Sequence, residues 1–179
     1  MAGGLAGAVD RIQRARRAPQ VTMAPLSLVV LSCSALIALA VATDVRQCAG
    51  KSFNQLAENV QLSPCKKLPC RLKKGTDQHI TINFTPDEDL TDVKNEVTAK
   101  VLGLDVPFIG VDGNSICDKL YTESGEKAEC PVKAGNKYVY KDSFPVLTVY
   151  PSINTNVHWA LLGRSNKNII CFEVPVRIQ

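Results

Sequence analysis

The sequence has few of the residues, and none of the common motifs, on which enzyme sites depend. Its 179 residues include only two histidines, one tryptophan and 6% aromatic residues. No G-x-S-x-G, H-E-x-x-H or G-x-x-x-x-G-K motif occurs, so serine hydrolase, zinc protease and phosphate-loop chemistry all lack their usual sequence signals. His79 and His158 stand apart, and each falls on the polar side of an alternating segment, as solvated histidines do. We therefore expect a protein that is not an enzyme, with no catalytic residue and no cofactor.

A strong excess of one charge is also missing from most of the chain. The formal net charge is +4, but four arginines and one aspartate precede residue 43. The remaining residues include 17 Lys and Arg against 16 Asp and Glu. Nucleic-acid binding usually requires a clearly basic domain. We therefore expect no nucleic acid partner, and only weak, transient contact with membranes.

Long apolar runs are limited to one segment near the beginning of the sequence. Residues 21–43 have no charged side chain and include the apolar stretch Leu26–Ala40. Arginines precede this stretch, and the small-x-small sequence Ala40-Val41-Ala42 ends it, as in a secretory signal peptide. We expect residues 1–42 to be such a signal peptide, with Met23 as an alternative start.

An uncleaved signal anchor is the rival interpretation of this segment. Its 23 uncharged residues are long enough to span a bilayer. The cleavage sequence ending at Ala42 and the interruption at Pro25 favour removal instead. A secreted mature chain of residues 43–179 is the expected result.

The cysteines that remain after cleavage are even in number. Cys33 is lost with the signal peptide, which leaves Cys48, Cys65, Cys70, Cys117, Cys130 and Cys171. Six cysteines in an oxidising compartment suggest three disulfides, but they allow fifteen pairings and spacing alone does not select among them. No C-x-x-C sequence occurs and the histidines are isolated, so we expect no metal site.

Alternation with period two dominates the chain from Asp77 onward and predicts strands. Turn sequences rich in Gly, Asn, Asp and Pro separate the alternating runs. About seven short strands fit a single all-β domain built as an antiparallel sandwich. The inward stripes are Ile80, Ile82 and Phe84; Val97, Ala99 and Val101; Phe144, Val146, Thr148 and Tyr150; Val157, Trp159 and Leu161; and Ile170, Phe172, Val174, Val176 and Ile178.

One N-x-[ST] acceptor occurs, at Asn83-Phe84-Thr85. Asn83 alternates with the apolar Ile82 and Phe84, so its side chain is expected to face solvent. In a secreted protein Asn83 is therefore a candidate for N-glycosylation, with an unused acceptor as the alternative.

The apolar stripes leave the nature of the interior open. Two facing sheets need an apolar core in any sandwich, so ordinary core packing is the default interpretation. A ligand cavity is the alternative, because alternation does not distinguish a filled interior from a hollow one.

Several short strings occur in an order that resembles the ML lipid-recognition family, from about Cys48 to the C terminus and including all six mature cysteines. They are Ser63-Pro64-Cys65, Pro69-Cys70 with Leu72, Val106-Pro107-Phe108, Cys130-Pro131-Val132, Tyr138-Val139-Tyr140, Phe144-Pro145-Val146, Tyr150-Pro151-Ser152-Ile153 and Cys171-Phe172-Glu173-Val174-Pro175-Val176.

The resemblance implies an immunoglobulin-like β-sandwich of about seven strands with an internal apolar lipid pocket. It also implies the disulfides Cys48–Cys171, Cys65–Cys70 and Cys117–Cys130. The family's pocket positions fall on Val97, Val101, Val106, Phe108, Tyr140, Phe144, Val146, Tyr150 and Trp159.

The function that this resemblance implies is transport of a sterol or another apolar lipid between membranes or carriers. The expected setting is extracellular or the lysosomal lumen, with a membrane sterol transporter as a candidate partner and a monomeric carrier. Two alternatives stay open: a carrier of other hydrophobic ligands, such as semiochemicals or microbial lipids, and a receptor-accessory sandwich that holds no ligand.

Overall fold

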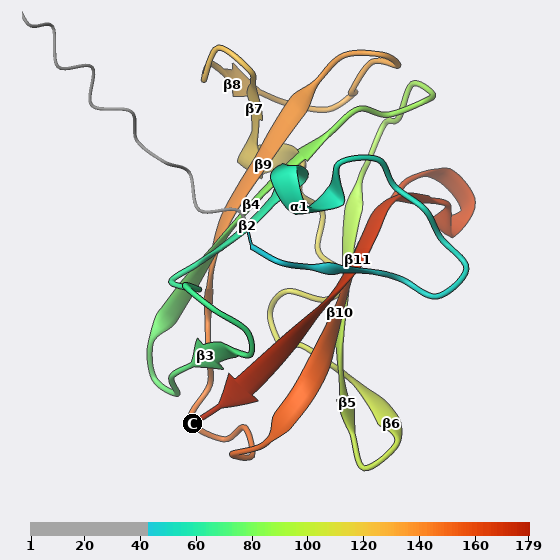
Figure 1. Ribbon diagram of the computed structural model, residues 1–179. Coiled ribbons are helices and arrows are strands. Elements are labelled where there is room, and N and C mark those ends of the chain that lie inside the picture. Colours follow the sequence, from blue (N-terminus) through green and yellow to red (C-terminus); the bar gives the residue numbers. More distant parts are fainter. Residues whose placement is uncertain (1–42) are drawn as a thin grey trace, which may run out of the picture. The chain divides into compact units, whose positions relative to one another are not determined.

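The computed structural model describes residues 43–179 and shows two β-sheets that face each other (Figure 1). The expected signal peptide, including Cys33, lies outside the described residues. The first sheet has the strand order β1-β11-β10-β5-β6, and β3 pairs with β11. Its strands are β1 (Arg46–Gln47), β3 (Cys70–Leu72), β5 (Lys94–Val101), β6 (Leu104–Pro107), β10 (Asn154–Leu162) and β11 (Asn168–Ile178).

The second sheet has the order β2-β4-β9-β7-β8. Its strands are β2 (Val60–Ser63), β4 (Asp77–Phe84), β7 (Leu120–Thr122), β8 (Lys127–Ala128) and β9 (Tyr138–Pro145). The short helices in the described part of the chain are α1 (Leu56–Asn59), η1 (Cys117–Lys119) and η2 (Arg164–Asn166). Among residues 43–179, no helix is long and apolar enough to cross a membrane.

The expected all-β sandwich is confirmed. All strand pairs are antiparallel except β3 with β11, which is parallel. The described chain has eleven strands where alternation predicts about seven. The difference arises because β1, β3, β7 and β8 have only two or three residues, which is too short for a period of two to be visible.

The expected stripe from Phe144 to Tyr150 is wrong as a strand. Strand β9 begins earlier, at Tyr138, and ends at Pro145, which pairs with Asp77 at the first position of β4. No residue of β4 remains to pair with the chain beyond this point. The chain turns instead, with the Tyr150 amide donating to the Leu147 carbonyl at 3.2 Å.

The core fills the space between the sheets with the inward side chains of the long strands. Strand β4 shows the pattern clearly, because Ile80, Ile82 and Phe84 are buried whereas His79 and Asn83 are exposed. Strand β11 buries Phe172, Val174, Val176 and Ile178 from the opposite side. The alternation seen in the sequence therefore places the apolar side chains between the two sheets.

Three disulfides connect segments of the sandwich: Cys48–Cys171, Cys65–Cys70 and Cys117–Cys130. These are the pairs that the family resemblance implies. Cys48–Cys171 joins residues 123 positions apart and ties the segment around β1 to β11. The other two bridges close short loops, with separations of 5 and 13 residues.

Candidate functional site

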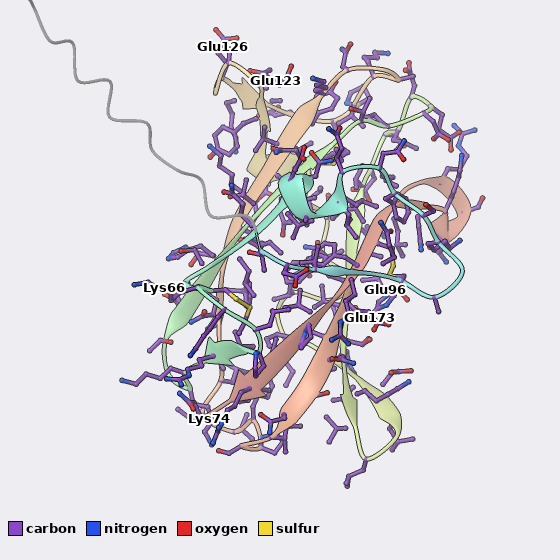
Figure 2. All side chains as sticks on the ribbon, in the orientation of Figure 1. Lys66, Lys74, Glu96, Glu123, Glu126 and Glu173 are labelled. Carbon is purple, nitrogen blue, oxygen red and sulfur yellow. A yellow bond between two sulfur atoms is a disulfide. The ribbon has the colours of Figure 1, made fainter. Side chains whose placement is uncertain are left out.

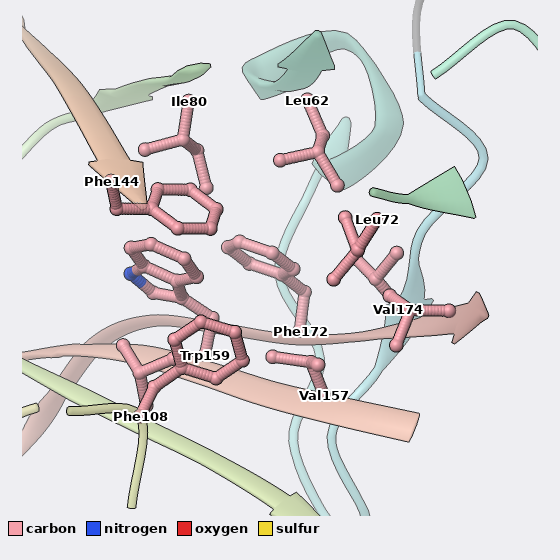
Figure 3. A pocket seen from close by; sticks show the side chains of 11 residues that line it. Leu62, Leu72, Ile80, Phe108, Phe144, Val157, Trp159, Phe172 and Val174 are labelled. Carbon is pink, nitrogen blue, oxygen red and sulfur yellow. The ribbon is translucent and has the colours of Figure 1, made fainter. Parts of the chain in front are cut away.

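An apolar cavity lies between the two sheets (Figure 3). Both sheets contribute to its wall, and every lining side chain is aliphatic or aromatic. The first sheet and its connections supply Leu72, Val97, Phe108, Val157, Trp159, Phe172, Val174 and Val176; the second sheet supplies Leu62, Ile80 and Phe144. Such a wall offers almost nothing to a charged ligand and favours burial of apolar surface.

The cavity is narrow in this structure. Its volume is about 20 Å³, which corresponds to about one water molecule. Pockets that hold small-molecule ligands usually measure about 300–1,000 Å³. A ligand of that size therefore fits between the sheets only if lining side chains or the sheets move apart.

Aromatic rings form one continuous part of the wall. Phe108 contacts Phe144 edge to face at 5.8 Å between ring centroids, and Phe144 contacts Trp159 at 5.4 Å. Trp159 stacks on Phe172 at 6.4 Å. These rings come from four separate segments of both sheets, and Figure 3 shows them grouped around the gap. Because aromatic pairs of this geometry attract each other, these contacts hold the wall together across the two sheets.

A chain of polar side chains crosses the core beside Trp159. The Trp159 indole donates to Asn95 Oδ1 at 3.0 Å, and Asn95 Nδ2 donates to the Tyr140 hydroxyl at 2.8 Å. The hydroxyl donates in turn to Asp142 at 2.7 Å, and Lys119 pairs with the same carboxylate at 2.9 Å. Burial is the main cause that raises the pKa of Tyr140, so the hydroxyl keeps its proton. Since Asn95 and Tyr140 belong to different sheets, this chain links the sheets across the core.

Hydrogen bonds of its own backbone and of neighbouring residues position Phe108. Its amide donates to the Val97 carbonyl at 2.8 Å, and the Val97 amide donates to Asp112 at 2.7 Å. The next amide, of Ile109, donates to the Tyr150 hydroxyl at 3.0 Å. Tyr150 is half-buried, its ring lies 5.0 Å from that of Phe108, and burial raises its pKa. Tyr150 therefore connects the segment after β6 to the turn after β9.

Four of the nine expected pocket residues line the cavity: Val97, Phe108, Phe144 and Trp159. Tyr140 and Val146 are fully buried but lie outside the lining set; the Tyr140 hydroxyl belongs to the polar chain described above. The other three are more exposed than expected and do not line the cavity: Val101 and Tyr150 are half-buried, and Val106 is 42% exposed.

Val106 differs from the expectation because β6 is an edge strand. All four residues of β6 are exposed, and β6 pairs only with β5. The wall is completed instead by Phe108, one residue beyond the strand.

Sequence reasoning missed seven lining residues: Leu62, Leu72, Ile80, Val157, Phe172, Val174 and Val176. Five of these already stand on alternating stripes, whereas Leu62 and Leu72 come from strands of four and three residues.

Large apolar side chains are exposed in the β5–β6 hairpin, just after it, and in the turn after β9. Leu102 is 99% exposed, at the turn between β5 and β6, and Leu104 is 70% exposed. Val106, Ile109 and Val149 are also exposed, and the Ile109–Tyr150 hydrogen bond brings the last two segments together. We call these five residues the apolar rim. Large apolar side chains left exposed on connected segments suggest contact with a membrane or a protein.

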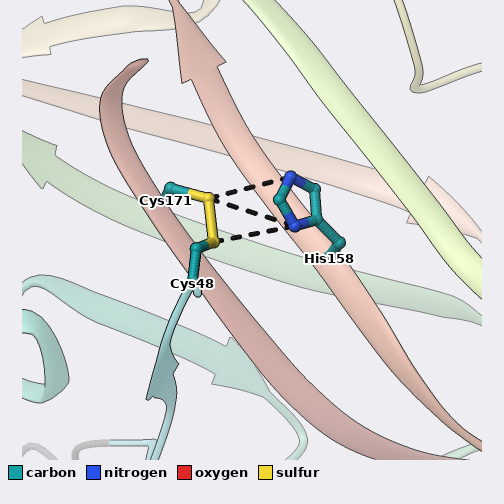
Figure 4. Close-up of side chains that lie close together, drawn as sticks. All are labelled: Cys48, His158 and Cys171. Carbon is teal, nitrogen blue, oxygen red and sulfur yellow. Dashed lines mark hydrogen bonds between the residues drawn. A yellow bond between two sulfur atoms is a disulfide. The ribbon is translucent and has the colours of Figure 1, made fainter. Parts of the chain in front are cut away.

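His158 lies against the Cys48–Cys171 disulfide on the outward face of the first sheet (Figure 4). Its Nδ1 is 3.6 Å from Cys48 Sγ, and its Nε2 is 3.7 Å from Cys171 Sγ. Both sulfur atoms are bonded to each other, so they are not the thiolates that a metal ion would bind. Glu96 and Glu173, labelled in Figure 2, line the same shallow outward groove as His158. The groove is polar and separate from the cavity.

Asn83 is exposed on the outward side of β4, as alternation predicts. It borders a surface groove with Phe84, Tyr138 and Ile169. The site is therefore accessible for a modifying enzyme on the folded domain.

Comparison with known proteins assigns this two-sheet sandwich to a family. The family model of the ML domain matches residues 42–178. The chain is 32% identical over 154 residues to NPC intracellular cholesterol transporter 2 homolog a of Drosophila melanogaster, which covers 86% of this chain and 99% of that protein. It is 33% identical over 122 residues to NPC intracellular cholesterol transporter 2 of Canis lupus familiaris, covering 68% of this chain and 76% of the relative.

A solved structure shows the same fold. The Niemann-Pick type C2 protein from the Japanese carpenter ant superposes with a TM-score of 0.57 at 23% identity, over 68% of this chain and 89% of that chain. The fold and the cavity define an all-β sandwich domain with an apolar interior. The chain belongs to the ML-domain family. This assignment supports the expectation that it is not an enzyme.

Proposed function

We propose that this protein carries a sterol or a similar apolar lipid between its two sheets and transfers it between membranes or carriers. The observation that carries the proposal is a cavity whose eleven lining residues are all aliphatic or aromatic. Support also comes from relatives in Drosophila and dog that are named as cholesterol transporters. No covalent step is needed, because burial of apolar surface drives binding.

The driving force is large enough for tight binding. Burial of roughly 400–500 Å² of ligand surface at about 25 cal/mol/Å² provides a gross gain on the order of 10 kcal/mol. Lost ligand freedom and the ordering of side chains subtract much of this gain. In this protein the opening of the closed cavity subtracts more, because the Phe108–Phe144 and Phe144–Trp159 contacts must rearrange. A carrier benefits from this balance, since a ligand held too tightly would not be released.

Transient membrane contact is proposed to occur through the apolar rim. Leu102 and Gly103 form the β5–β6 turn with φ angles of 51° and 85°, a conformation that normally favours Asn-Gly. An almost fully exposed leucine at such a position gains nothing in packing from the folded domain. Insertion of the turn into a lipid surface would bury it, next to the segment that holds Phe108.

The setting that we propose is secretion, into the extracellular space or the lysosomal lumen. The signal peptide of residues 1–42 would be removed after Ala42, and an oxidising compartment suits the three disulfides. In this setting Asn83 would receive a glycan. We also propose that the carrier is a monomer and that a membrane sterol transporter is its partner.

Extraction of the secreted protein tests the proposal directly. Protein purified without detergent from eukaryotic medium is expected to release a stoichiometric sterol or other apolar lipid into organic solvent, identified by mass spectrometry. A different apolar lipid would identify the ligand as something other than sterol. Empty protein that also fails to bind any added sterol, fatty alcohol or fatty acid would contradict the carrier and favour the ligand-free accessory domain.

A matched pair of variants tests the location of the ligand. Phe108→Ala removes a cavity wall, whereas Phe84→Ala removes a phenylalanine that is equally buried but does not line the cavity. Each change should reduce stability by about 3–5 kcal/mol. Only Phe108→Ala should weaken binding of a fluorescent sterol, by about tenfold or more, which corresponds to ~1.4 kcal/mol of lost contact. Equal affinities of the two variants would place the ligand elsewhere.

A further inference from the structure

Within residues 43–179, one buried side-chain nitrogen or oxygen atom lacks a hydrogen-bond partner. This atom is Oε1 of Gln78. The residue is only 2% exposed and belongs to the inward face of β4. The other two buried polar side chains, Thr43 and Asn95, both have partners. A buried acceptor without a donor is unfavourable and uncommon, so this oxygen calls for a physical explanation.

The hydrogen bonds around Gln78 fix the direction of its amide group. Its Nε2 donates to the Thr76 hydroxyl at 3.3 Å and to the Asp77 carbonyl at 3.1 Å. The Thr76 hydroxyl gives its own proton to the Lys73 carbonyl at 2.7 Å, so it can only accept from Gln78. Both neighbours are therefore acceptors, and exchanging the amide oxygen and nitrogen would place oxygen against oxygen. Oε1 must point away from them.

The register of the strands places Gln78 beside the cavity. Gln78 pairs directly with Phe144 on β9, and Phe144 lines the cavity. Ile80, two residues further along the same inward face, lines it as well. Directly paired side chains on one face of a sheet have Cβ atoms about 4.5–5.5 Å apart. Gln78 itself is not among the eleven lining residues, but it stands directly beside two of them on the inward face of the second sheet.

We propose that Gln78 Oε1 accepts a hydrogen bond from a hydroxyl group of the bound lipid. This inference rests on the proposed lipid-carrier function and specifies its ligand class: an apolar molecule with one hydrogen-bond donor, such as a sterol or a long-chain alcohol. A hydrocarbon leaves the oxygen without a partner. A ketone, an ester or an ionised carboxylate places an acceptor against an acceptor, which is worse.

Ligand pairs measure this preference without any mutation. Diphenylhexatriene, a fluorescent hydrocarbon with no polar group, serves as the displaced probe. Cholesterol should displace it at concentrations about 3- to 10-fold lower than cholest-5-ene, which lacks the hydroxyl, as one neutral hydrogen bond provides. The corresponding 3-ketone should compete no better than cholest-5-ene. Hexadecanol and hexadecane should show the same order.

Variants then assign the preference to Gln78. Gln78→Met keeps the length of the side chain but has no carbonyl, and it should reduce the ratio between cholesterol and cholest-5-ene to about 1. His79→Met, at the next position on the outward face of β4, should leave the ratio unchanged. If Gln78→Met does not fold, Gln78→Leu, which also lacks the carbonyl, takes its place with the same expected ratio of about 1.

The outcomes separate this inference from the proposed function. Equal displacement by cholesterol, its 3-ketone and cholest-5-ene would overturn the role of Gln78 while leaving the lipid carrier intact. A preference that persists in Gln78→Met would overturn it as well, because another group would then bind the hydroxyl. Failure of the wild type to bind diphenylhexatriene and both sterols would overturn the carrier itself.

Discussion

Replacement of Asn95 by leucine tests whether the polar chain through the core links the two sheets in solution. Asn95 accepts from the Trp159 indole and donates to the Tyr140 hydroxyl, and leucine does neither. The indole would become a buried donor without a partner, at a cost of about 1–3 kcal/mol, and the lost bond to Tyr140 adds about 1 kcal/mol. Tyr140 keeps its bond to Asp142. We therefore expect the free energy of unfolding to fall by about 2–4 kcal/mol.

Urea denaturation provides the measurement, followed by the fluorescence of Trp159, the one tryptophan in the sequence. Asn154→Leu is the matched control, because it is the same substitution at an exposed position of β10 and should change stability by less than about 0.5 kcal/mol. Combining Asn95→Leu with Tyr140→Phe should show a coupling of about 1 kcal/mol. If Asn95→Leu destabilises no more than Asn154→Leu, the polar chain does not hold the sheets together.

Three further predictions concern folding, modification and transfer. Cys171→Ser removes the disulfide that closes a loop of 123 residues, and the chain-entropy model assigns this closure about 5 kcal/mol of stability. The variant should therefore stay inside eukaryotic cells, and normal secretion would contradict this expectation. Asn83→Gln should migrate faster on a gel after eukaryotic expression and still bind lipid, and an unchanged band would reject glycosylation. Leu102→Asp should slow sterol transfer between vesicles several-fold with unchanged affinity, because a charge opposes membrane insertion; unaltered transfer would exclude the β5–β6 turn as the contact.

Alternation in the sequence predicts the sandwich and four of its five long strands, but it misses most of β9. Val157, Trp159, Phe172 and Val174 all face inward in the structure, as their stripes indicate. Alternation could not predict β1 or β3, because two or three residues contain no period. It also extended the stripe of Phe144 beyond Pro145, since the end of a strand depends on whether its neighbour continues.

The cavity itself was less predictable than the sheets. A stripe indicates which face of a strand is apolar, but the lining depends on which residues of the opposite sheet stand across the gap. The family resemblance placed Val106 in the wall, although β6 is an exposed edge strand, and Leu62 lies in a strand of only four residues. Gln78 shows the same limit: a polar residue beside Asp77 at the beginning of a strand resembles a solvent-exposed end, and only packing shows that it is buried.

The β5–β6 turn has a consequence for attempts to stabilise this protein. Leu102 occupies a left-handed backbone conformation that asparagine or glycine adopts at much lower cost. A search for stabilising substitutions would therefore select Leu102→Asn early and record a gain in melting temperature. If the exposed leucine serves membrane contact, the same search would remove the activity that it was meant to preserve. Thermal stability and transfer rate should be selected together in any engineering of this domain.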